Sequence, residues 1–229
     1  MGSVGHGTSL TDNAGLESHP RTVSTSTLPT LAAVDLACRR GDRILFKGLQ
    51  FEVKPGQVVW LRGANGRGKT SLLRLLAGLS TPEAGRVDWG GGARQLVYIA
   101  HANALKEDLT VRESLRFLAR LHGRDDSPAK LDAALALFGM ASRRDAPVRT
   151  LSQGQHRRVA LSRLALDEAP SLWILDEPFD SLDHEGIATL NGLLTRHTAN
   201  GGSVVLTSHQ ALTLAEPQPV TVQLDDASS

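Results

Sequence analysis

A glycine-rich octapeptide at residues 63–70 constrains this chain more than any other segment. It reads Gly63-Ala64-Asn65-Gly66-Arg67-Gly68-Lys69-Thr70 and fits the pattern G-x-x-x-x-G-K-[ST] at every fixed position. A short buried strand is predicted before it, at residues 57–61, and a helix after it, at residues 69–77. In this context the glycines let backbone N–H groups converge on phosphate oxygens, and the helix N-terminus adds a favourable dipole. The alternative is a glycine-rich turn beside a surface lysine, but the flanking strand and helix favour phosphate binding.

The residues of this loop have separate expected roles in binding ATP and Mg²⁺, which we predict as cofactors. Lys69 places a positive charge on the β and γ phosphates, where it contributes to both binding and catalysis. Thr70 offers its hydroxyl to Mg²⁺. Ser71 continues the new helix beside the phosphates, and we include it among the nucleotide-binding residues together with Gly63–Gly68.

A second segment places two carboxylates after an apolar run, Leu172-Trp173-Ile174-Leu175. This run is typical of a central buried strand, and Asp176 at its end lies where a doubly wound sheet places its ligand. Asp176 is expected to hold Mg²⁺ through water, and Glu177 to polarise the attacking water as a general base. Two adjacent acids after a strand are often only a solvated turn, but the phosphate-binding loop upstream favours the catalytic interpretation.

A third segment, Leu151-Ser152-Gln153-Gly154-Gln155, precedes an arginine-rich helix. Ser152 and Gln155 have the spacing of a capping box, and Gly154 allows backbone to approach an anion closely. A capped helix N-terminus that presents N–H groups is a second phosphate-binding element. A simple helix cap would also explain Ser152 and Gln155, but it would not explain their combination with the loop at 63–70.

The order of elements predicts an α/β fold. Short apolar runs between turns suggest an antiparallel strand group over residues 31–53, and strands and helices alternate thereafter. We expect a P-loop NTPase core, a mostly parallel sheet flanked by helices, with an N-terminal antiparallel β subdomain. An inserted helical subdomain is expected at about residues 107–165, with capping boxes at Thr110 and Ser152, and a short helix is expected after His209. Residues 1–28 are rich in Gly, Ser and Thr and are interpreted as a disordered leader to a domain at 29–229.

Composition excludes several classes of function. The net charge of +1 produces no strong positive potential that would attract nucleic acid, so no nucleic-acid partner is expected. The single cysteine, Cys38, forms no C-x-x-C metal or haem-attachment pattern. No apolar run reaches the length that spans a bilayer, and the N-terminus lacks the features of a secretory signal. If the protein acts at a membrane, a partner must carry it there.

With these motifs in place, the chain resembles the ATP-binding-cassette (ABC) family over roughly residues 31–224. Leu151–Gln155 is close to the family's LSGGQ signature, and Ser181-Leu182-Asp183 looks like its D-loop. His209 follows a strand and resembles the switch histidine that contacts the γ-phosphate, although an isolated histidine there is usually a surface residue. The resemblance implies a second copy of the chain as partner, with each ATP between Gly63–Thr70 of one copy and Ser152–Gln155 of the other.

Two positions depart from the family pattern. The family usually stacks an aromatic residue on adenine, whereas this chain has Arg40 in that region. A guanidinium can also stack on a base, or Arg40 is a solvated turn residue, and both interpretations stay open. At the end of the strand over residues 96–100, the family's Mg²⁺-sensing glutamine is replaced by His101. An imidazole there could hydrogen-bond a Mg²⁺-bound water and respond to pH near neutrality; the alternative is a tolerated polar substitution.

His101 and the run Lys106-Glu107-Asp108-Leu109-Thr110 resemble one branch, the ATP-binding subunits of the haem exporter of bacterial cytochrome c maturation. The short stretch after His209 is also typical of this branch. The resemblance implies peripheral attachment to the cytoplasmic face of the inner membrane. Its implied partners are an integral membrane transporter subunit and a haem-handling membrane protein, and ATP hydrolysis would energise release of the haem-loaded chaperone.

Three other functions remain as alternatives. The chain could be the ATPase subunit of an ABC transporter for another substrate, which His101 and the short C-terminal stretch disfavour. It could be a soluble ABC protein acting on DNA or the ribosome, but such proteins usually carry a coiled-coil insertion or a second cassette. A P-loop kinase or GTPase is disfavoured by the Leu151–Gln155 signature and by His209.

Overall fold

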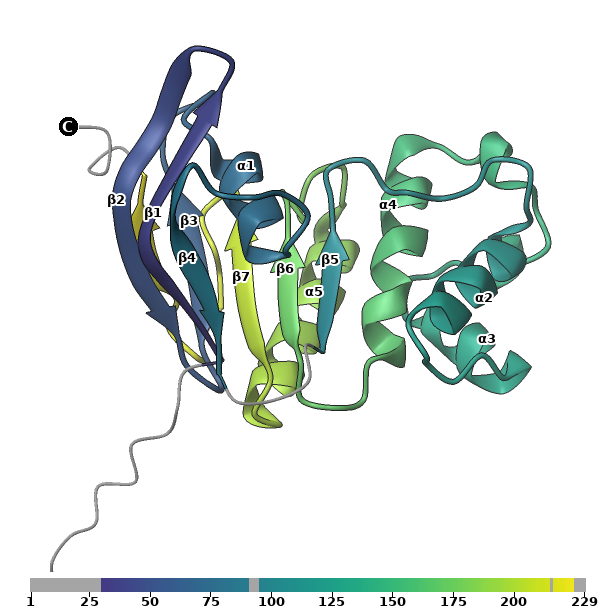
Figure 1. Ribbon diagram of the computed structural model, residues 1–229. Coiled ribbons are helices and arrows are strands. Elements are labelled where there is room, and N and C mark those ends of the chain that lie inside the picture. Colours follow the sequence, from purple (N-terminus) through teal and green to yellow (C-terminus); the bar gives the residue numbers. More distant parts are fainter. Residues whose placement is uncertain (1–29, 91–94, 215, 225–229) are drawn as a thin grey trace, which may run out of the picture.

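The computed structural model describes residues 30–90, 95–214 and 216–224 (Figure 1). The predicted leader at 1–28 lies outside these residues, and the predicted domain start at 29 and subdomain limits 107–165 stay predictions. The strands are β1 (Leu31–Arg40), β2 (Arg43–Val53), β3 (Val58–Arg62), β4 (Ala84–Trp89), β5 (Leu96–Ile99), β6 (Leu172–Leu175), β7 (Ser203–Thr207) and β8 (Val220–Gln223). The α-helices are α1 (Lys69–Leu76), α2 (Val111–Leu121), α3 (Pro128–Leu137), α4 (Gln153–Ser162) and α5 (His184–Ala199). Short 3-10 turns cover Ala141–Arg143, Val148–Thr150 and Arg163–Leu166.

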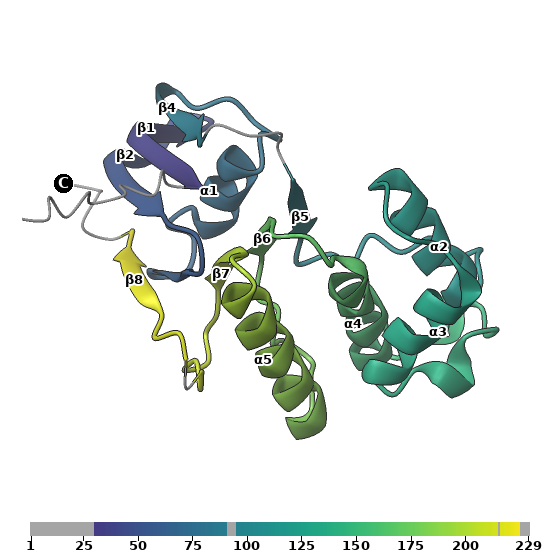
Figure 2. The ribbon, with the colours of Figure 1, turned by 90° about the horizontal axis from the view of Figure 1, so that it is seen from below.

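The strands form two sheets, which confirms the predicted α/β fold. An antiparallel sheet has the order β2-β1-β4, and a parallel sheet has the order β5-β6-β7-β3-β8. Helix α1 lies between the two sheets, and α5 covers the opposite face of the parallel sheet (Figure 2). The predicted antiparallel group at 31–53 is β1 and β2, and β4 joins it through β1.

Strand β6 shows why the parallel sheet is buried on both faces. Its side chains alternate between the faces, as the period of a strand requires. Leu172 and Ile174 pack in the core around α1, whereas Trp173 and Leu175 pack in the core formed with α2, α3, α4 and α5. All four are at most 1% exposed, and such continuous apolar runs are characteristic of a sheet covered on both sides.

Helices α2, α3 and α4 gather beyond the β5 edge of the parallel sheet (Figures 1 and 2). Both predicted capping boxes are confirmed. The Thr110 hydroxyl accepts a hydrogen bond from the Glu113 N–H at 3.3 Å, and the Glu113 carboxylate accepts one from the Thr110 N–H at 2.9 Å. Ser152 and Gln155 make the same reciprocal pair at the start of α4. The described residues include no helix with the length and apolar composition for crossing a membrane.

Two expectations about helices need correction. The predicted short helix after His209 is wrong, since residues 208–214 and 216–219 contain bends and no helix. The Ser208 hydroxyl accepts the Gln210 N–H at 3.0 Å, which competes with a helical hydrogen bond, and Pro217 and Pro219 remove two further donors.

The arginine-rich helix predicted after Leu151–Gln155 is α-helical only as far as Ser162, and it continues as a 3-10 turn to Leu166. At that point the Ser162 hydroxyl donates a hydrogen bond to the Arg158 carbonyl at 2.9 Å. Such back-bonding to the carbonyl four residues earlier disturbs the regular helical pattern.

The cap of α2 allows a quantitative prediction about the stability of the folded protein. Thr110→Ala removes the side-chain acceptor for the Glu113 N–H, so it should lower the free energy of unfolding by about 1 kcal/mol. Urea unfolding followed by circular dichroism measures the loss. Ser127→Ala is a matched control, because Ser127 is also an N-cap residue but makes no side-chain capping bond. Equal losses in the two variants would contradict the prediction.

Candidate functional site

The glycine-rich loop lies between the carboxyl end of β3 and the start of α1. Gly68 is the N-cap of α1, with a φ of 98°, in the left-handed region that favours glycine. A Cβ on Gly68 would lie 3.0 Å from the Cβ of Leu45, so close packing against β2 also favours glycine. The Lys69 ammonium donates to the Gly63 carbonyl at 2.8 Å and to the Ala64 carbonyl at 3.5 Å. The lysine therefore turns back over its own loop.

The loop faces the acidic end of β6. Asp176 is 2% exposed, and both of its carboxylate oxygens accept hydrogen bonds. Thr70 of α1 donates to Oδ2 at 2.8 Å, and Thr207 at the end of β7 donates to Oδ1 at 2.9 Å. A buried carboxylate is costly unless its oxygens have such partners. Asp176 thus connects the ends of α1, β6 and β7 at one edge of the sheet, as expected for ligand sites in such folds.

Glu177 has an unusual backbone conformation, with a φ of 47°. Left-handed conformations of residues other than glycine cost about 1–3 kcal/mol and persist only where the surroundings enforce them. The Glu177 N–H donates to Thr207 Oγ1 at 2.8 Å. The carboxylate accepts from the His209 N–H at 3.0 Å and lies 3.5 Å from His209 Nε2. The predicted base and the predicted switch histidine are therefore direct neighbours.

A cleft at this sheet edge brings together most of the predicted site residues. Those lining it are Arg40, Asn65, Gly66, Gly68, Lys69, Thr70, Ser71, His101, Asp176, Glu177 and His209. Gly63 lines an adjoining hollow together with Lys69 and His209. Ala64 and Arg67 belong to the loop but not to the lining of the cleft.

The second predicted anion-binding element does not meet this cleft within the chain. Ser152, Gly154 and Gln155 stand at the first turn of α4 and do not line it. Gly154 instead packs on the D-loop segment, because a Cβ there would lie 2.8 Å from the Ser181 carbonyl oxygen. His101 connects the two regions, since it lines both the cleft and a neighbouring pocket with Gln153.

Two residues that hold the site were not identified from the sequence. Thr207 is bonded to both acidic residues, and its position directly before Ser208-His209 was the available signal. Arg157 is 3% exposed and donates to the carbonyls of Asp176 and Glu177 at 2.7 and 2.6 Å. It lies in the arginine-rich run that follows the capping box, but the sequence does not indicate which arginine of that run turns inward.

A phosphate-binding loop opposite a buried carboxylate pair, across the ends of parallel strands, is the arrangement of a nucleotide-hydrolysing P-loop protein. The sequence profile of the family described as "ABC transporter" matches residues 46–180, more than half of the chain.

Curated relatives define the branch. The chain is 47% identical over 211 residues to the "Cytochrome c biogenesis ATP-binding export protein CcmA" of Aromatoleum aromaticum, covering 88% of this chain and 98% of that protein. It is 50% identical over 191 residues to the protein of the same name from Methylococcus capsulatus, covering 80% and 92%. The chain belongs to the ABC transporter family, among the ATP-binding export proteins of cytochrome c biogenesis, as the motifs predicted.

Solved structures agree with this fold. One described as "Structure of ATP binding subunit of ABC transporter" is 29% identical and superposes with a TM-score of 0.71 over 79% of each chain. Another is a putative ABC transporter ATP-binding protein from Pyrococcus furiosus, which is 22% identical and has a TM-score of 0.75 over 87% of this chain and 99% of its own. At this identity the similarity concerns the fold alone.

The environment of Glu177 leads us to predict how ATP turnover depends on pH. Burial raises the pKa of this carboxyl above its ordinary value of 4.5, while the charge of His209 opposes the rise. A general base acts as the carboxylate, so ATP turnover should fall as the pH falls through the raised pKa. In His209→Asn the opposing charge is absent, so the acidic limb should move to higher pH.

The measurement is ATP turnover over a pH series from acid to neutral, with each profile normalised to its own plateau. Circular dichroism at each pH controls for unfolding. An acidic limb that stays in place or moves to lower pH in His209→Asn would show that His209 does not influence the charge of Glu177.

Proposed function

We propose that this chain is the ATP-hydrolysing subunit of an ABC complex for haem export or handling in cytochrome c biogenesis. In this proposal it acts peripherally at the cytoplasmic face of the bacterial inner membrane, and hydrolysis energises release of a haem-loaded chaperone. The observation that carries the proposal is the 47% identity to the A. aromaticum export protein, which extends over 98% of that protein. His101 supports it, because a histidine at this position is what the resemblance to that branch implies.

The working unit in this proposal is a dimer with two ATP molecules between the subunits. The separation of the two anion-binding elements supports it, since Ser152, Gly154 and Gln155 do not line the cleft that contains Lys69 and Thr70. The N–H groups at the capped start of α4 are suited to phosphate oxygens. A second copy would bring its own α4 to the γ-phosphate, and closure of the pair would move the membrane partner.

The chemistry assigned to the cleft is attack of water on the γ-phosphoryl group. Glu177 takes a proton from the attacking water while the water oxygen forms its bond to the γ-phosphorus. His209, whose N–H holds one oxygen of that carboxylate, orients the water and contacts the γ-phosphate. Lys69 moves from its loop carbonyls to the β and γ phosphates, and its charge stabilises the developing negative charge. The bond from the γ-phosphorus to the bridging oxygen then breaks, and ADP and phosphate leave.

The residues around Asp176 fit a Mg²⁺ ion. Thr70 Oγ1 and Asp176 Oδ2 lie 2.8 Å apart, and hydroxyl and carboxylate oxygens are the hard donors that Mg²⁺ prefers. We propose that Thr70 holds the ion directly and that Asp176 and His101 hold it through water. When bound, Mg²⁺ would supply positive charge beside the β and γ phosphates.

Arg40 is proposed to stack on adenine. It lies at the end of β1 and lines the cleft beside Leu45 and the loop. Its neighbour Arg39 points elsewhere and pairs with Glu83 at 3.3 Å. The planar guanidinium of Arg40 can lie flat against a base, which supports a role in place of an aromatic ring.

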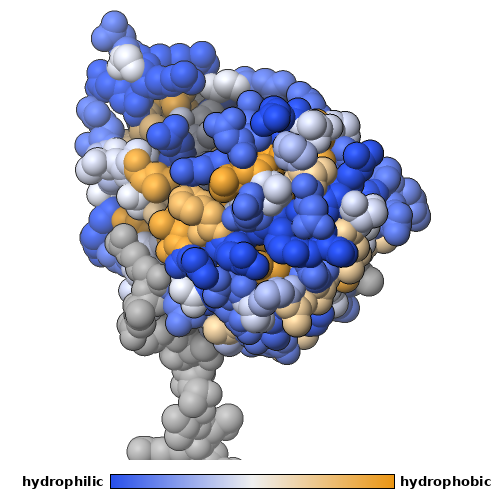
Figure 3. Space-filling model, turned by 90° about the vertical axis from the view of Figure 1, so that its right-hand side faces the viewer, coloured by the Kyte–Doolittle hydropathy of each residue, from blue (hydrophilic) through white to orange (hydrophobic). Residues whose placement is uncertain are grey.

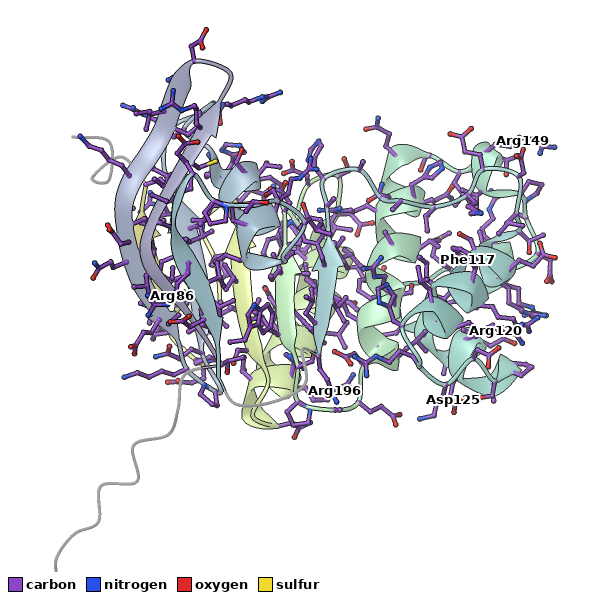
Figure 4. The ribbon with its side chains drawn as sticks, viewed as in Figure 1. Arg86, Phe117, Arg120, Asp125, Arg149 and Arg196 are labelled. Carbon is purple, nitrogen blue, oxygen red and sulfur yellow. The ribbon has the colours of Figure 1, made fainter. Side chains whose placement is uncertain are left out.

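The helical end of the molecule offers a surface for the proposed membrane transporter subunit. Figure 3 shows hydrophobic surface among hydrophilic side chains on this face. Leu121 is 65% exposed, and Phe117 and Leu137 are also exposed. The Lys106 ammonium lies 4.6 Å from the centre of the Phe117 ring. Phe117 and Arg120 stand far from the antiparallel sheet, where Arg86 lies (Figure 4). The haem-handling membrane protein would join through this transporter subunit.

Glu177→Gln tests both the ATPase assignment and the pathway. Turnover should fall by about 100-fold or more, because the base is lost, while the affinity for ATP measured by calorimetry stays within a few-fold. In a strain deleted for the chain, the wild type should restore c-type cytochromes and Glu177→Gln should not. Near wild-type hydrolysis by Glu177→Gln would refute the assignment of the base. Normal c-type cytochromes in the deletion strain would refute the proposed pathway and favour another transported substrate.

His101→Gln tests the residue that departs from the family pattern. We expect ATP binding to be retained, because the loop residues are unchanged, but coupling to the membrane partner to be altered. The measurements are ATP turnover with and without the co-purified membrane proteins and the level of c-type cytochromes in complemented cells. Arg40→Gln is a useful control, because it alters the same cleft at its adenine side. Full cytochrome c maturation with His101→Gln would leave the histidine without a special role.

A further inference from the structure

A buried arginine holds the segment that contains the proposed general base. Arg157 lies on α4, and its guanidinium donates to acceptors on two other segments. One is the turn after β6, where it reaches the carbonyls of Asp176 at 2.7 Å and Glu177 at 2.6 Å, and that of Pro178 at 3.4 Å. The other follows β5, where it reaches the Ala100 carbonyl and Asn103 Oδ1, both at 3.0 Å.

All hydrogen-bond partners of Arg157 in this network are neutral, so the positive charge of the arginine is not paired directly with a carboxylate. Burial lowers the pKa of Arg157, and the negative charges of Asp180, Asp176 and Glu177 oppose that effect without contacting the guanidinium directly. Burying a cation among carbonyl groups is costly. What arginine provides in return is a rigid planar fork of N–H donors, which can bind several acceptors at fixed angles.

Two of these acceptors flank the α-carbon of Glu177. The Asp176 carbonyl belongs to the peptide group before Glu177, and the Glu177 carbonyl belongs to the peptide group after it. Fixing both peptide planes fixes the φ and ψ angles between them. Thr207 holds the N–H of the first of these peptide groups at 2.8 Å. Together Arg157 and Thr207 therefore account for the left-handed φ of 47° at Glu177. Without these hydrogen bonds, we expect the backbone of Glu177 to adopt a more favourable φ.

We propose that Arg157 is a positioning residue for ATP hydrolysis, whose guanidinium keeps Glu177 in the left-handed conformation that directs its carboxylate toward the nucleotide cleft. The same side chain fixes the Ala100 carbonyl, directly before His101. Arg157 lies on α4, whose N-cap is Ser152, so the same side chain also connects the turn that contains Glu177 to this helix. This inference rests on the proposed role of Glu177 as general base.

The decisive variant is Arg157→Lys, which keeps the positive charge but loses the planar fork. We expect kcat for ATP to fall by about 10- to 100-fold, as displacement of a reacting group by about 1 Å does, while KM changes less than about threefold. Arg163→Lys is the matched control. Arg163 also donates to a carbonyl of β5, that of Tyr98, but it makes no hydrogen bond to the turn after β6 within the described part of the chain. The kcat of Arg163→Lys should therefore be unchanged.

A double-mutant cycle separates positioning of Glu177 from a general structural effect. In the Glu177→Gln background, which lacks the base, Arg157→Lys should cause almost no further loss of single-turnover rate, because contacting residues that act through one group are not additive. Additive losses, an unchanged kcat in Arg157→Lys, or an equal loss in Arg163→Lys would each overturn the proposal. Failure of Glu177→Gln itself to slow hydrolysis would instead refute the proposed base.

A second variant keeps the inference testable if Arg157→Lys does not fold. Asn103→Ala removes a side-chain acceptor of the guanidinium while the arginine stays buried among its carbonyl partners. It should lower kcat by about two- to tenfold with little change in KM, since the arginine remains but is oriented less well. A folded Asn103→Ala variant with wild-type kcat would then count against Arg157 as the residue that positions the base.

Discussion

The structure depends on one buried carboxylate. Asp176 accepts hydrogen bonds from Thr70 and Thr207, and these hydroxyls come from the helix after the phosphate-binding loop and from the neighbouring strand. Without them the carboxylate would be a buried charge lacking partners, which proteins avoid at considerable cost. Because each donor lies on a different element, the same two bonds that stabilise the charge also fix where the loop and β7 stand relative to β6.

Much of the fold and most of the residues that line the cleft could be predicted from local sequence. The loop at 63–70 and the caps at Thr110 and Ser152 depend on spacing within a few residues, and the structure has them as expected. Thr207 and Arg157 were not identified, because their roles arise only from contacts with residues more than 15 positions away. The helix expected after His209 is wrong for a local reason, since the Ser208 hydroxyl takes the Gln210 N–H.

The predicted anion-binding groups of the chain lie in two separate places. Lys69 and Thr70 line the cleft, whereas the start of α4 lies against the D-loop at Ser181. Arg157 connects these two places within the chain, because it lies on α4 and donates hydrogen bonds to the turn that contains Glu177. The start of α4 is therefore connected to Glu177 through the backbone of that helix, the Arg157 side chain and its hydrogen bonds to the Asp176 and Glu177 carbonyls.

The strand order has a consequence for biosynthesis. Strand β3, which leads into the phosphate-binding loop, pairs only with β7 and β8 among the described strands, so that Val59 lies beside Val205 and Val220. The hairpin of β1 and β2 can form early on the ribosome because its contacts are local, but the loop has no supporting sheet until the last strands emerge. A nascent or truncated chain that lacks β7 and β8 leaves β3 without these pairing strands and lacks Thr207 and His209, so the cleft can be completed only after the end of the chain has been made.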